Sequence, residues 1–273
     1  MDRNLALEVV RVTEAAALSS ARWMGRGNAK AAAQVAADAM RRGFDAMDFA
    51  GTIVLGEGDR GQSPILYTGE RLGSGREPEL EVALDPLDGA SVVAHGRGNA
   101  IAEAMRCHVE DLTVAVLDRP RHEELVRRVR EVGARIKLIA DGDLSAAIAT
   151  GVEGSEVDVL MGTGGTREGV LAAAALQCLG GDLQGRLRPR NDAEVERAHA
   201  AGVRDLDHVF TIDELAGGKN VMFAATGVTD GDLLKGVRFF GGGARTHSMV
   251  VRARSGTVRF IEATHRFDRR PVY

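Results

Sequence analysis

The order of short apolar runs and helical segments limits the fold more than any other feature of the chain. The runs are rich in β-branched and aliphatic residues and are bounded by glycine or aspartate, which is typical of strands. They are GTIVLGE, LEVALD, DLTVAVLD, RIKLIAD, VDVLMG and NVMFAATG. The segments PRHEELVRRVREVG, GDLSAAIATG and TREGVLAAAALQCLG have helical character and separate several of them. This alternation predicts an α/β fold with a β-α-β-α-β unit over roughly residues 111–180.

The two ends of the chain depart from this alternation. LALEVVRVTEAAA has apolar residues at helical spacing, and AKAAAQVAADAMRRG is an alanine-rich helix that we expect to end at Gly43. The tail GVRFFGGGARTHSMVVRARSGTVRFIEATHRF predicts antiparallel strands joined by glycine turns. We therefore expect an N-terminal α+β metal-site domain over residues 1–108. A C-terminal α/β substrate domain covers residues 109–273, and its tail strands are free to return to the first sheet.

Composition excludes several classes of function. The chain has 273 residues, 44% of them hydrophobic, which is enough for a substantial core. Its net charge is −4, and it has no block of like charges, so we expect no nucleic-acid or membrane partner. Cys107 and Cys178 are too few for a disulfide framework and lack the spacing of a zinc site. With no secretory signal or apolar span in the sequence, we expect a soluble cytoplasmic protein that acts on a small molecule.

Carboxylates follow two of the predicted strands. Glu57 comes directly after VLG, and the segment LDPLDGA places Asp85 and Asp88 on either side of a proline. Pro86 blocks further strand pairing, so both aspartates and the Leu87 carbonyl can converge on one point. Hard cations such as Mg²⁺ or Mn²⁺ require oxygen ligands of this kind. The alternative is an ordinary aspartate–proline turn.

Charged residues also follow the next strands. RPRH supplies the guanidinium groups of Arg119 and Arg121, which suit a phosphate, and DGD supplies Asp141 and Asp143, which suit sugar hydroxyls. Ligands of open α/β sheets bind beyond the carboxyl ends of strands. From these residues alone, a solvated arginine and a helix-capping turn are the more common roles. Glu168 likewise falls in the first turn of a predicted helix, where it favours the helix dipole.

The histidines carry less information. His122 in RPRH and His247 in ARTHSMVV are the two with functional potential. A histidine whose hydrogen bonds are satisfied in the core or at the surface is the more common role for either. His247 is an acid–base candidate if the protein does not hydrolyse its substrate.

A series of motifs, taken in order, resembles one family. These are RVTEAAALSSARWMGRG, GEGDRGQSPILYTGERLGSG, LEVALDPLDGASVVAHGRGNAIA, DLTVAVLDRPRH, DGDLSAAIAT, EVDVLMGTGGTREGV, GDLQGRL, VMFAATGVTDGDLLKGV and ARTHSMVVR. They are similar to the class II fructose-1,6-bisphosphatases of GlpX type, within the inositol-monophosphatase-like superfamily. The resemblance implies an αβαβα layered sandwich with mixed sheets. It also implies a cytoplasmic sugar-phosphate phosphatase that uses Mg²⁺ or Mn²⁺ and forms a homodimer or homotetramer.

The resemblance also implies roles for single residues. Metal binding falls to Glu57, Asp85, Asp88 and Glu168, with the carbonyl of Leu87, and the first three are also the catalytic residues. Substrate binding falls to Gly89, Ala90, Arg119, Arg121, Asp141 and Asp143.

The chain departs from the family at several positions. GRGNAKAAAQVA has Ala29 and Ala33 where the family has a lysine and an aspartate, and Ala90 stands where a threonine is expected. Gly61 replaces a further acid, and a long family segment between GNAIAEAMR and DLTVAVLD is missing. In the superfamily, the aspartate and the hydroxyl activate the attacking water. The metal ligands are kept, whereas the usual means of making hydroxide is lost.

Three functions are compatible with this pattern. The first is a metal-dependent sugar-phosphate phosphatase of altered specificity. The second is a non-hydrolytic enzyme, such as an isomerase, epimerase, cyclase or lyase, that acts on a phosphorylated sugar. The third is a catalytically inactive binding protein, which the four retained carboxylates argue against.

Overall fold

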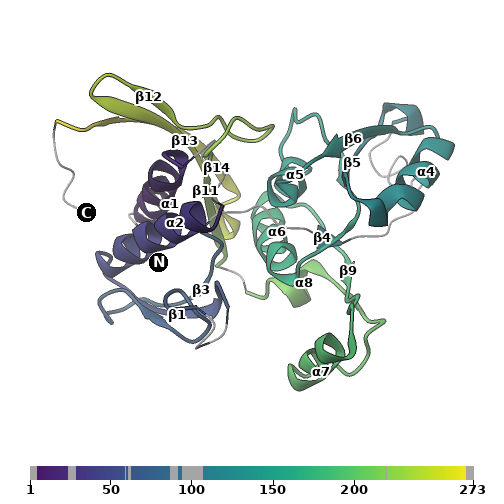
Figure 1. Ribbon diagram of the computed structural model, residues 1–273, viewed down its shortest axis with the longest axis horizontal. Coiled ribbons are helices and arrows are strands. Elements are labelled where there is room, and N and C mark those ends of the chain that lie inside the picture. Colours follow the sequence, from purple (N-terminus) through teal and green to yellow (C-terminus); the bar gives the residue numbers. More distant parts are fainter. Residues whose placement is uncertain are drawn as a thin grey trace. The chain divides into compact units, whose positions relative to one another are not determined.

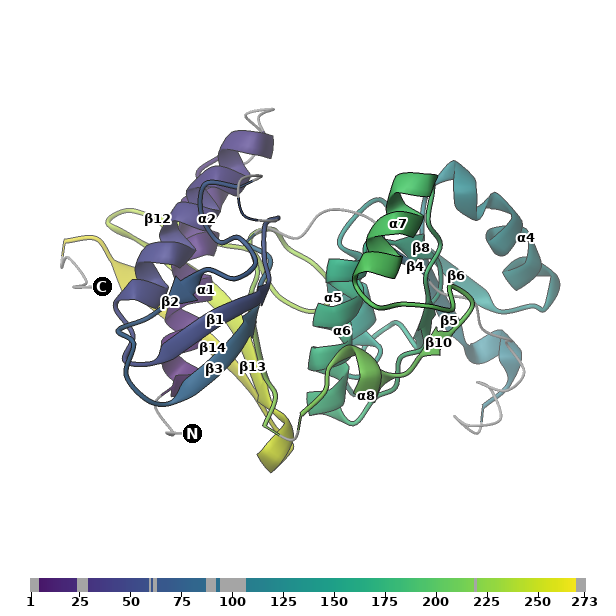
Figure 2. The same cartoon turned by 90° about the horizontal axis from the view of Figure 1, so that it is seen from below.

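The computed structural model divides the chain into two compact units (Figures 1 and 2). One unit comprises Met1–Asp88 and Met222–Tyr273, and the other comprises Gly89–Val221. The structure describes residues 5–23, 29–58, 60, 63–86, 92–93, 107–218 and 220–268.

The first unit combines two helices with two sheets. Its elements are α1 (Leu5–Ala21), α2 (Ala29–Asp45), β1 (Ala50–Leu55), β2 (Arg71–Leu72), β3 (Glu79–Ala83), β11 (Met222–Thr226), β12 (Arg238–Phe240), β13 (Gly243–Arg252), η3 (Ala253–Ser255) and β14 (Thr257–Arg266). The smaller sheet is mixed and has the order β2-β1-β3, with β1 parallel to β3. The larger sheet is antiparallel, and β11, β12 and β14 each pair with β13. The antiparallel strands predicted for the tail are β12, β13 and β14.

The two helices pack closely because of a glycine inside α2. A side chain at Gly43 would place its Cβ 3.0 Å from Cγ2 of Val12 in α1. The expectation that α2 ends at Gly43 is therefore wrong: the helix continues to Asp45, and the glycine allows it to lie beside α1 (Figure 1). Met40 and Phe44 extend this contact into the buried core of the unit.

The second unit contains the predicted β-α-β-α-β segment. Its elements are β4 (Val92–Val93), η1 (Val109–Asp111), β5 (Thr113–Leu117), η2 (Pro120–His122), α4 (Glu123–Glu131), β6 (Arg135–Ile139), α5 (Asp143–Ala149), β7 (Val159–Leu160), β8 (Thr163–Gly164), α6 (Thr166–Leu179), β9 (Gly185–Arg186), α7 (Asp192–Ala200), β10 (Val209–Phe210) and α8 (Ile212–Leu215). The strands β6-β5-β7 form a wholly parallel sheet in that order. Short antiparallel pairs join β4 to β8 and β9 to β10. The predicted α/β class and the alternating unit are confirmed.

The units divide the chain differently from the domains expected over residues 1–108 and 109–273. The segment Met222–Tyr273, which includes the predicted tail, groups with the N-terminal residues because β11 and β13 pack against α1. Its strands form a sheet separate from β2-β1-β3. Within the described residues, no helix is both long enough and apolar enough to cross a membrane.

Candidate functional site

Two of the predicted metal ligands leave neighbouring strands of the first unit. Glu57 lies just beyond the end of β1, and Asp85 lies just beyond the end of β3. The strands are parallel, and the N–H of Leu84 donates to the carbonyl of Leu55 at 2.9 Å where they end. Both acids are half-buried and leave the same edge of one sheet. The two segments that carry these acids therefore begin at neighbouring strand ends.

A close backbone contact fixes the path of the chain at Glu57. Its N–H donates to the carbonyl of Leu66 at 2.9 Å. A Cβ on the preceding Gly56 would lie 2.1 Å from that same oxygen, closer than any side chain can approach. Glycine at position 56 therefore allows the backbone to lie this close to the Leu66 carbonyl, and the hydrogen bond to that carbonyl holds the backbone of Glu57.

Several predicted residues of the first half of the chain lie outside the described residues. These are Leu87, Asp88, Gly89 and Ala90, together with Gly61. Ala33, which replaces an expected aspartate, is half-buried on α2, and Ala29 begins that helix. Within the part of the chain that the structure describes, no three His, Cys, Asp or Glu side chains gather closely enough to hold a metal ion.

In the second unit, predicted ligands gather at the carboxyl ends of β5 and β6. The N–H of Asp118 donates to the carbonyl of Ile139 at 2.8 Å, which joins the two turns. Arg119 follows β5, whereas Asp141 and Asp143 follow β6. Arg119 and Asp141 lie near enough to Asp143 to act on its charge. The structure thus brings these three predicted residues together.

Asp143 has an unusual environment for a carboxylate. Its side chain is 1% exposed, and neither oxygen makes a hydrogen bond of normal geometry with any described residue. Burial is the main cause that raises the pKa of Asp143, and the charge of Asp141 adds to it. The backbone N–H groups of Asp143 and Leu144 and the charge of Arg119 act in the opposite direction. The Asp143 carboxyl group therefore keeps its proton to a higher pH than an ordinary aspartate does.

Arg121 and His122 both contact a segment that follows β7. The guanidinium of Arg121 donates from Nε and Nη2 to the carbonyl of Thr163, at 3.1 and 2.8 Å. His122 is 2% exposed and bonds the carbonyl of Leu117 and the N–H of Thr163. The favoured interpretation of His122 as a satisfied core histidine is confirmed. The role of Thr163 had no signal in the sequence because only its backbone takes part.

Glu168 stands in the first turn of α6 and is 4% exposed. Nη2 of Arg167 lies 3.8 Å from its Oε1 atom, and the helix dipole favours a negative charge at this end. Glu57 and Asp85 belong to the first unit, whereas Glu168 and the residues after β5 and β6 belong to the second.

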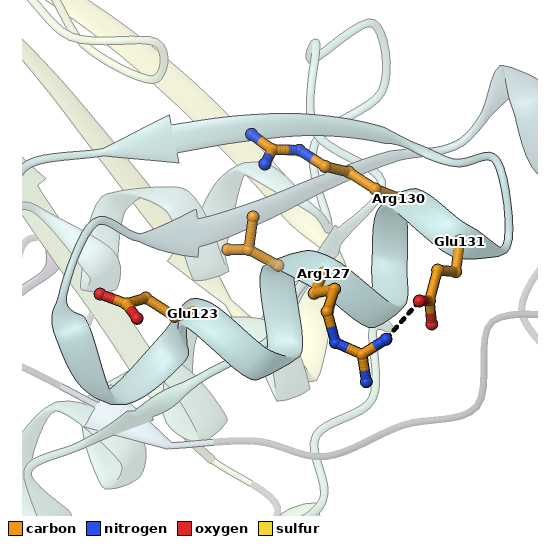
Figure 3. A pocket seen from close by; sticks show the side chains of 5 residues that line it. Glu123, Arg127, Arg130 and Glu131 are labelled. Carbon is orange, nitrogen blue, oxygen red and sulfur yellow. Dashed lines mark hydrogen bonds and ion pairs between the residues drawn. The ribbon is translucent and has the colours of Figure 1, made fainter.

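A surface hollow is also present along α4, and Figure 3 shows the side chains that line it. Arg127 forms an ion pair with Glu131 there, while Arg130 extends to another side. The lining residues are Glu123, Val126, Arg127, Arg130 and Glu131. All five belong to α4, and none is a predicted site residue.

The described residues define the chemistry that the protein can perform. Carboxylate oxygens beyond β1 and β3 suit a hard divalent cation. Guanidinium and carboxyl groups beyond β5 and β6 suit a phosphate and the hydroxyls of a polyol. Each set of side chains is therefore chemically suited to part of a phosphorylated, hydroxyl-rich ligand.

Comparisons with known proteins agree with this chemistry. The family model "Bacterial fructose-1,6-bisphosphatase, glpX-encoded" matches residues 3–104 and 100–265. A D-fructose 1,6-bisphosphatase class 2/sedoheptulose 1,7-bisphosphatase of Synechococcus sp. (strain JA-3-3Ab) is 40% identical, over 98% of this chain and 97% of its own length. The protein of the same description from Crocosphaera subtropica is 37% identical, over 100% and 99%. The chain belongs to the GlpX-type class II fructose-1,6-bisphosphatase family.

This membership confirms the predicted family and, with it, the class of sugar-phosphate phosphatase, a phosphoric monoester hydrolase of carbohydrate metabolism. Enzymes of this family depend on a metal. The family match falls into two segments that meet at residues 100–104. The alignments extend over 339 and 342 positions, whereas the chain has 273 residues. Both findings agree with the predicted loss of a long segment before β5.

Proposed function

We propose that this protein hydrolyses a phosphate ester of a phosphorylated sugar, with Mg²⁺ or Mn²⁺ as cofactor. The observation that carries the proposal is the placement of Glu57 and Asp85, which leave the same edge of two neighbouring parallel strands. The names of the relatives make D-fructose 1,6-bisphosphate and sedoheptulose 1,7-bisphosphate the first substrates to test.

The metal ligands in this proposal are Glu57, Asp85, Asp88 and Glu168, with the carbonyl oxygen of Leu87. The donor set fits a hard cation because every member is an oxygen. A divalent cation bound there supplies positive charge to the phosphate and lowers the pKa of a bound water. Glu57, Asp85 and Asp88 act in catalysis by holding that charge at the scissile ester.

The proposed substrate contacts lie mainly in the second unit. Arg119 and Arg121 hold a phosphate, and Gly89 and Ala90 also belong to the proposed substrate-binding residues. The Nε and Nη2 donors of Arg121 already bond the Thr163 carbonyl, so the guanidinium is held in place before a ligand arrives. Asp141 and Asp143 bond hydroxyls of the sugar. A protonated Asp143 can donate to a sugar oxygen as well as accept from a hydroxyl.

In the reaction, a bond forms between a water oxygen and phosphorus while the bond from phosphorus to the sugar oxygen breaks. The departing sugar oxygen takes a proton, and inorganic phosphate and a dephosphorylated sugar position result. Ala33 and Ala90 stand where the family places an aspartate and a hydroxyl to activate the water. General-base catalysis contributes typically about 10²–10⁴-fold, so we expect slower turnover than in enzymes that keep both groups.

The same two alanines favour a second candidate function. An enzyme that holds metal and phosphate without activating water can isomerise, epimerise, cyclise or cleave a phosphorylated sugar. A catalytically inactive protein that only binds a phosphorylated sugar is the remaining alternative.

We also propose that the chain adopts the αβαβα sandwich of the family and assembles as a homodimer or homotetramer.

A panel of sugar mono- and bisphosphates tests the proposal. The purified protein is incubated with each compound and Mg²⁺ or Mn²⁺, and phosphate release is read beside ¹H and ³¹P NMR spectra. We expect release from at least one bisphosphate, and we expect D85N to abolish it. E79Q is the matched control, because Glu79 is an exposed carboxylate at the start of the same strand. Conversion of a compound without phosphate release would support the second candidate instead.

A further inference from the structure

The turn after β5 and the short strand β8 are joined at one residue, Thr163. Arg121 donates twice to its carbonyl, and its N–H donates to Nε2 of His122 at 2.7 Å. Both backbone groups of Thr163 are therefore held by side chains of two consecutive residues. The side chains take the place of a neighbouring strand at this edge.

The bonds of His122 define its protonation state. Nδ1 lies 2.8 Å from the carbonyl of Leu117, which can only accept, so Nδ1 carries a hydrogen. The N–H of Thr163 can only donate, so Nε2 carries none. The ring is thus neutral and in the Nδ1–H tautomer, and at 2% exposure it has no freedom to exchange these roles with water.

The segment that His122 holds leads directly to a proposed metal ligand. Gly165 is the N-cap of α6, which begins at Thr166, and Glu168 stands in its first turn. On the other side, β8 pairs with β4, with Thr163 opposite Val93. The backbone of Thr163 thus lies between this strand pair and the N-cap of α6, which is two residues further along the chain.

We propose that His122 is a positioning residue, which fixes the backbone of Thr163 and, through it, the first turn of α6. It acts through Glu168 and does not touch the reacting atoms. The functional consequence rests on the proposed function, in which Glu168 binds metal. Partners that orient metal ligands typically contribute about 10–100-fold to metal affinity, and we expect a loss of this size when the bond to Thr163 is removed.

Two isosteric variants separate the two hydrogen bonds. In H122N, the side-chain amide keeps a donor near the position of Nδ1 and loses the acceptor for Thr163. In H122Q, the carbonyl oxygen reaches the position of Nε2 and keeps that acceptor. H199A is the matched control, because His199 also bonds a backbone carbonyl through Nδ1, that of Val203 at 2.8 Å, but is exposed on α7.

Three measurements test the proposal on the full chain. ¹⁵N NMR of the wild-type protein should show a protonated Nδ1 and an unprotonated Nε2 for His122. Hydrogen exchange of the amides from Thr163 to Glu168 should accelerate at least tenfold in H122N and much less in H122Q or H199A. Titration with Mn²⁺ alone should give an affinity about 10–100-fold lower in H122N, with recovery in H122Q.

The outcomes distinguish this proposal from the proposed function. A protonated Nε2, or an H122N variant whose amide exchange equals that of the wild type, overturns the positioning role. If both variants fail to fold, the wild-type ¹⁵N spectrum still decides. If H122N accelerates exchange but the wild-type protein neither binds Mn²⁺ nor releases phosphate, the positioning of α6 stands and the proposed function fails.

Discussion

Replacement of Gly56 by alanine should destabilise the first unit and displace Glu57. The added Cβ would lie 2.1 Å from the carbonyl oxygen of Leu66 and 2.9 Å from Cγ2 of Ile53. Because Leu66 is fully buried and the contact is with its backbone, the loop itself must move. The bond between the N–H of Glu57 and that carbonyl is then lost, which costs about 1 kcal/mol. Overpacking adds about 1–3 kcal/mol, so we expect a total loss of about 2–4 kcal/mol.

Urea unfolding at pH 7, followed by circular dichroism, measures this loss. G169A is the control: outside its own helix backbone and chain neighbours, no atom of the described residues lies within 4 Å of a Cβ at this helical position, and alanine should stabilise α6 by about 0.5–1 kcal/mol. We also expect weaker Mn²⁺ binding in G56A, because Glu57 follows the altered residue. A G56A protein whose free energy of unfolding lies within about 0.5 kcal/mol of the wild type would show that the chain accommodates a Cβ here without displacing the Leu66 carbonyl.

Three further predictions concern Glu14, Asp143 and the two alanines Ala33 and Ala90. Burial raises the pKa of Glu14 above its ordinary value of 4.5. The stability that this carboxyl group contributes is therefore complete below pH 4.5 and is lost as the pH rises through the raised pKa. Urea unfolding at a series of pH values from below 4.5 upward should show a decline in the free energy of unfolding that E14Q lacks. Burial also raises the pKa of Asp143, so D143N should have a higher free energy of unfolding than the wild type at pH 8, while calorimetry should show at least tenfold weaker binding of a sugar phosphate. The double variant A33D/A90T should increase the rate of phosphate release at least tenfold by restoring water activation, and an unchanged rate would show that another group already does this.

The sequence was sufficient to predict the features that depend on local periodicity. Glu57 and Asp85 were expected to meet because each follows a strand-forming run, and β1 and β3 are indeed parallel neighbours. Arg119, Asp141 and Asp143 also follow strand-forming runs, and they lie beyond the carboxyl ends of β5 and β6, but only the resemblance to the family favoured a binding role for them. Strand endings are visible in the sequence because glycine, proline and aspartate interrupt apolar runs.

Features that depend on packing between distant segments could not be predicted. Gly43 was expected to end a helix, but it lies inside α2, where a Cβ would come within 3.0 Å of Cγ2 of Val12 in the neighbouring helix α1. The helix α7 (Asp192–Ala200) has no buried residue, so its sequence lacks the apolar stripe from which a helix is predicted. The hydrogen bonds of Arg121 and His122 to Thr163 use its backbone groups, which every residue possesses. The grouping of the tail with α1 likewise depends on contacts across the whole chain.

We propose that the carboxylates beyond β1 and β3 support metal-dependent hydrolysis of a sugar phosphate. The most direct measurement is phosphate release from D-fructose 1,6-bisphosphate by metal-free protein, before and after Mn²⁺ is added. We predict that release begins only with Mn²⁺, persists in E79Q and is absent in D85N. Release that does not require the metal, or that D85N retains, would contradict the account.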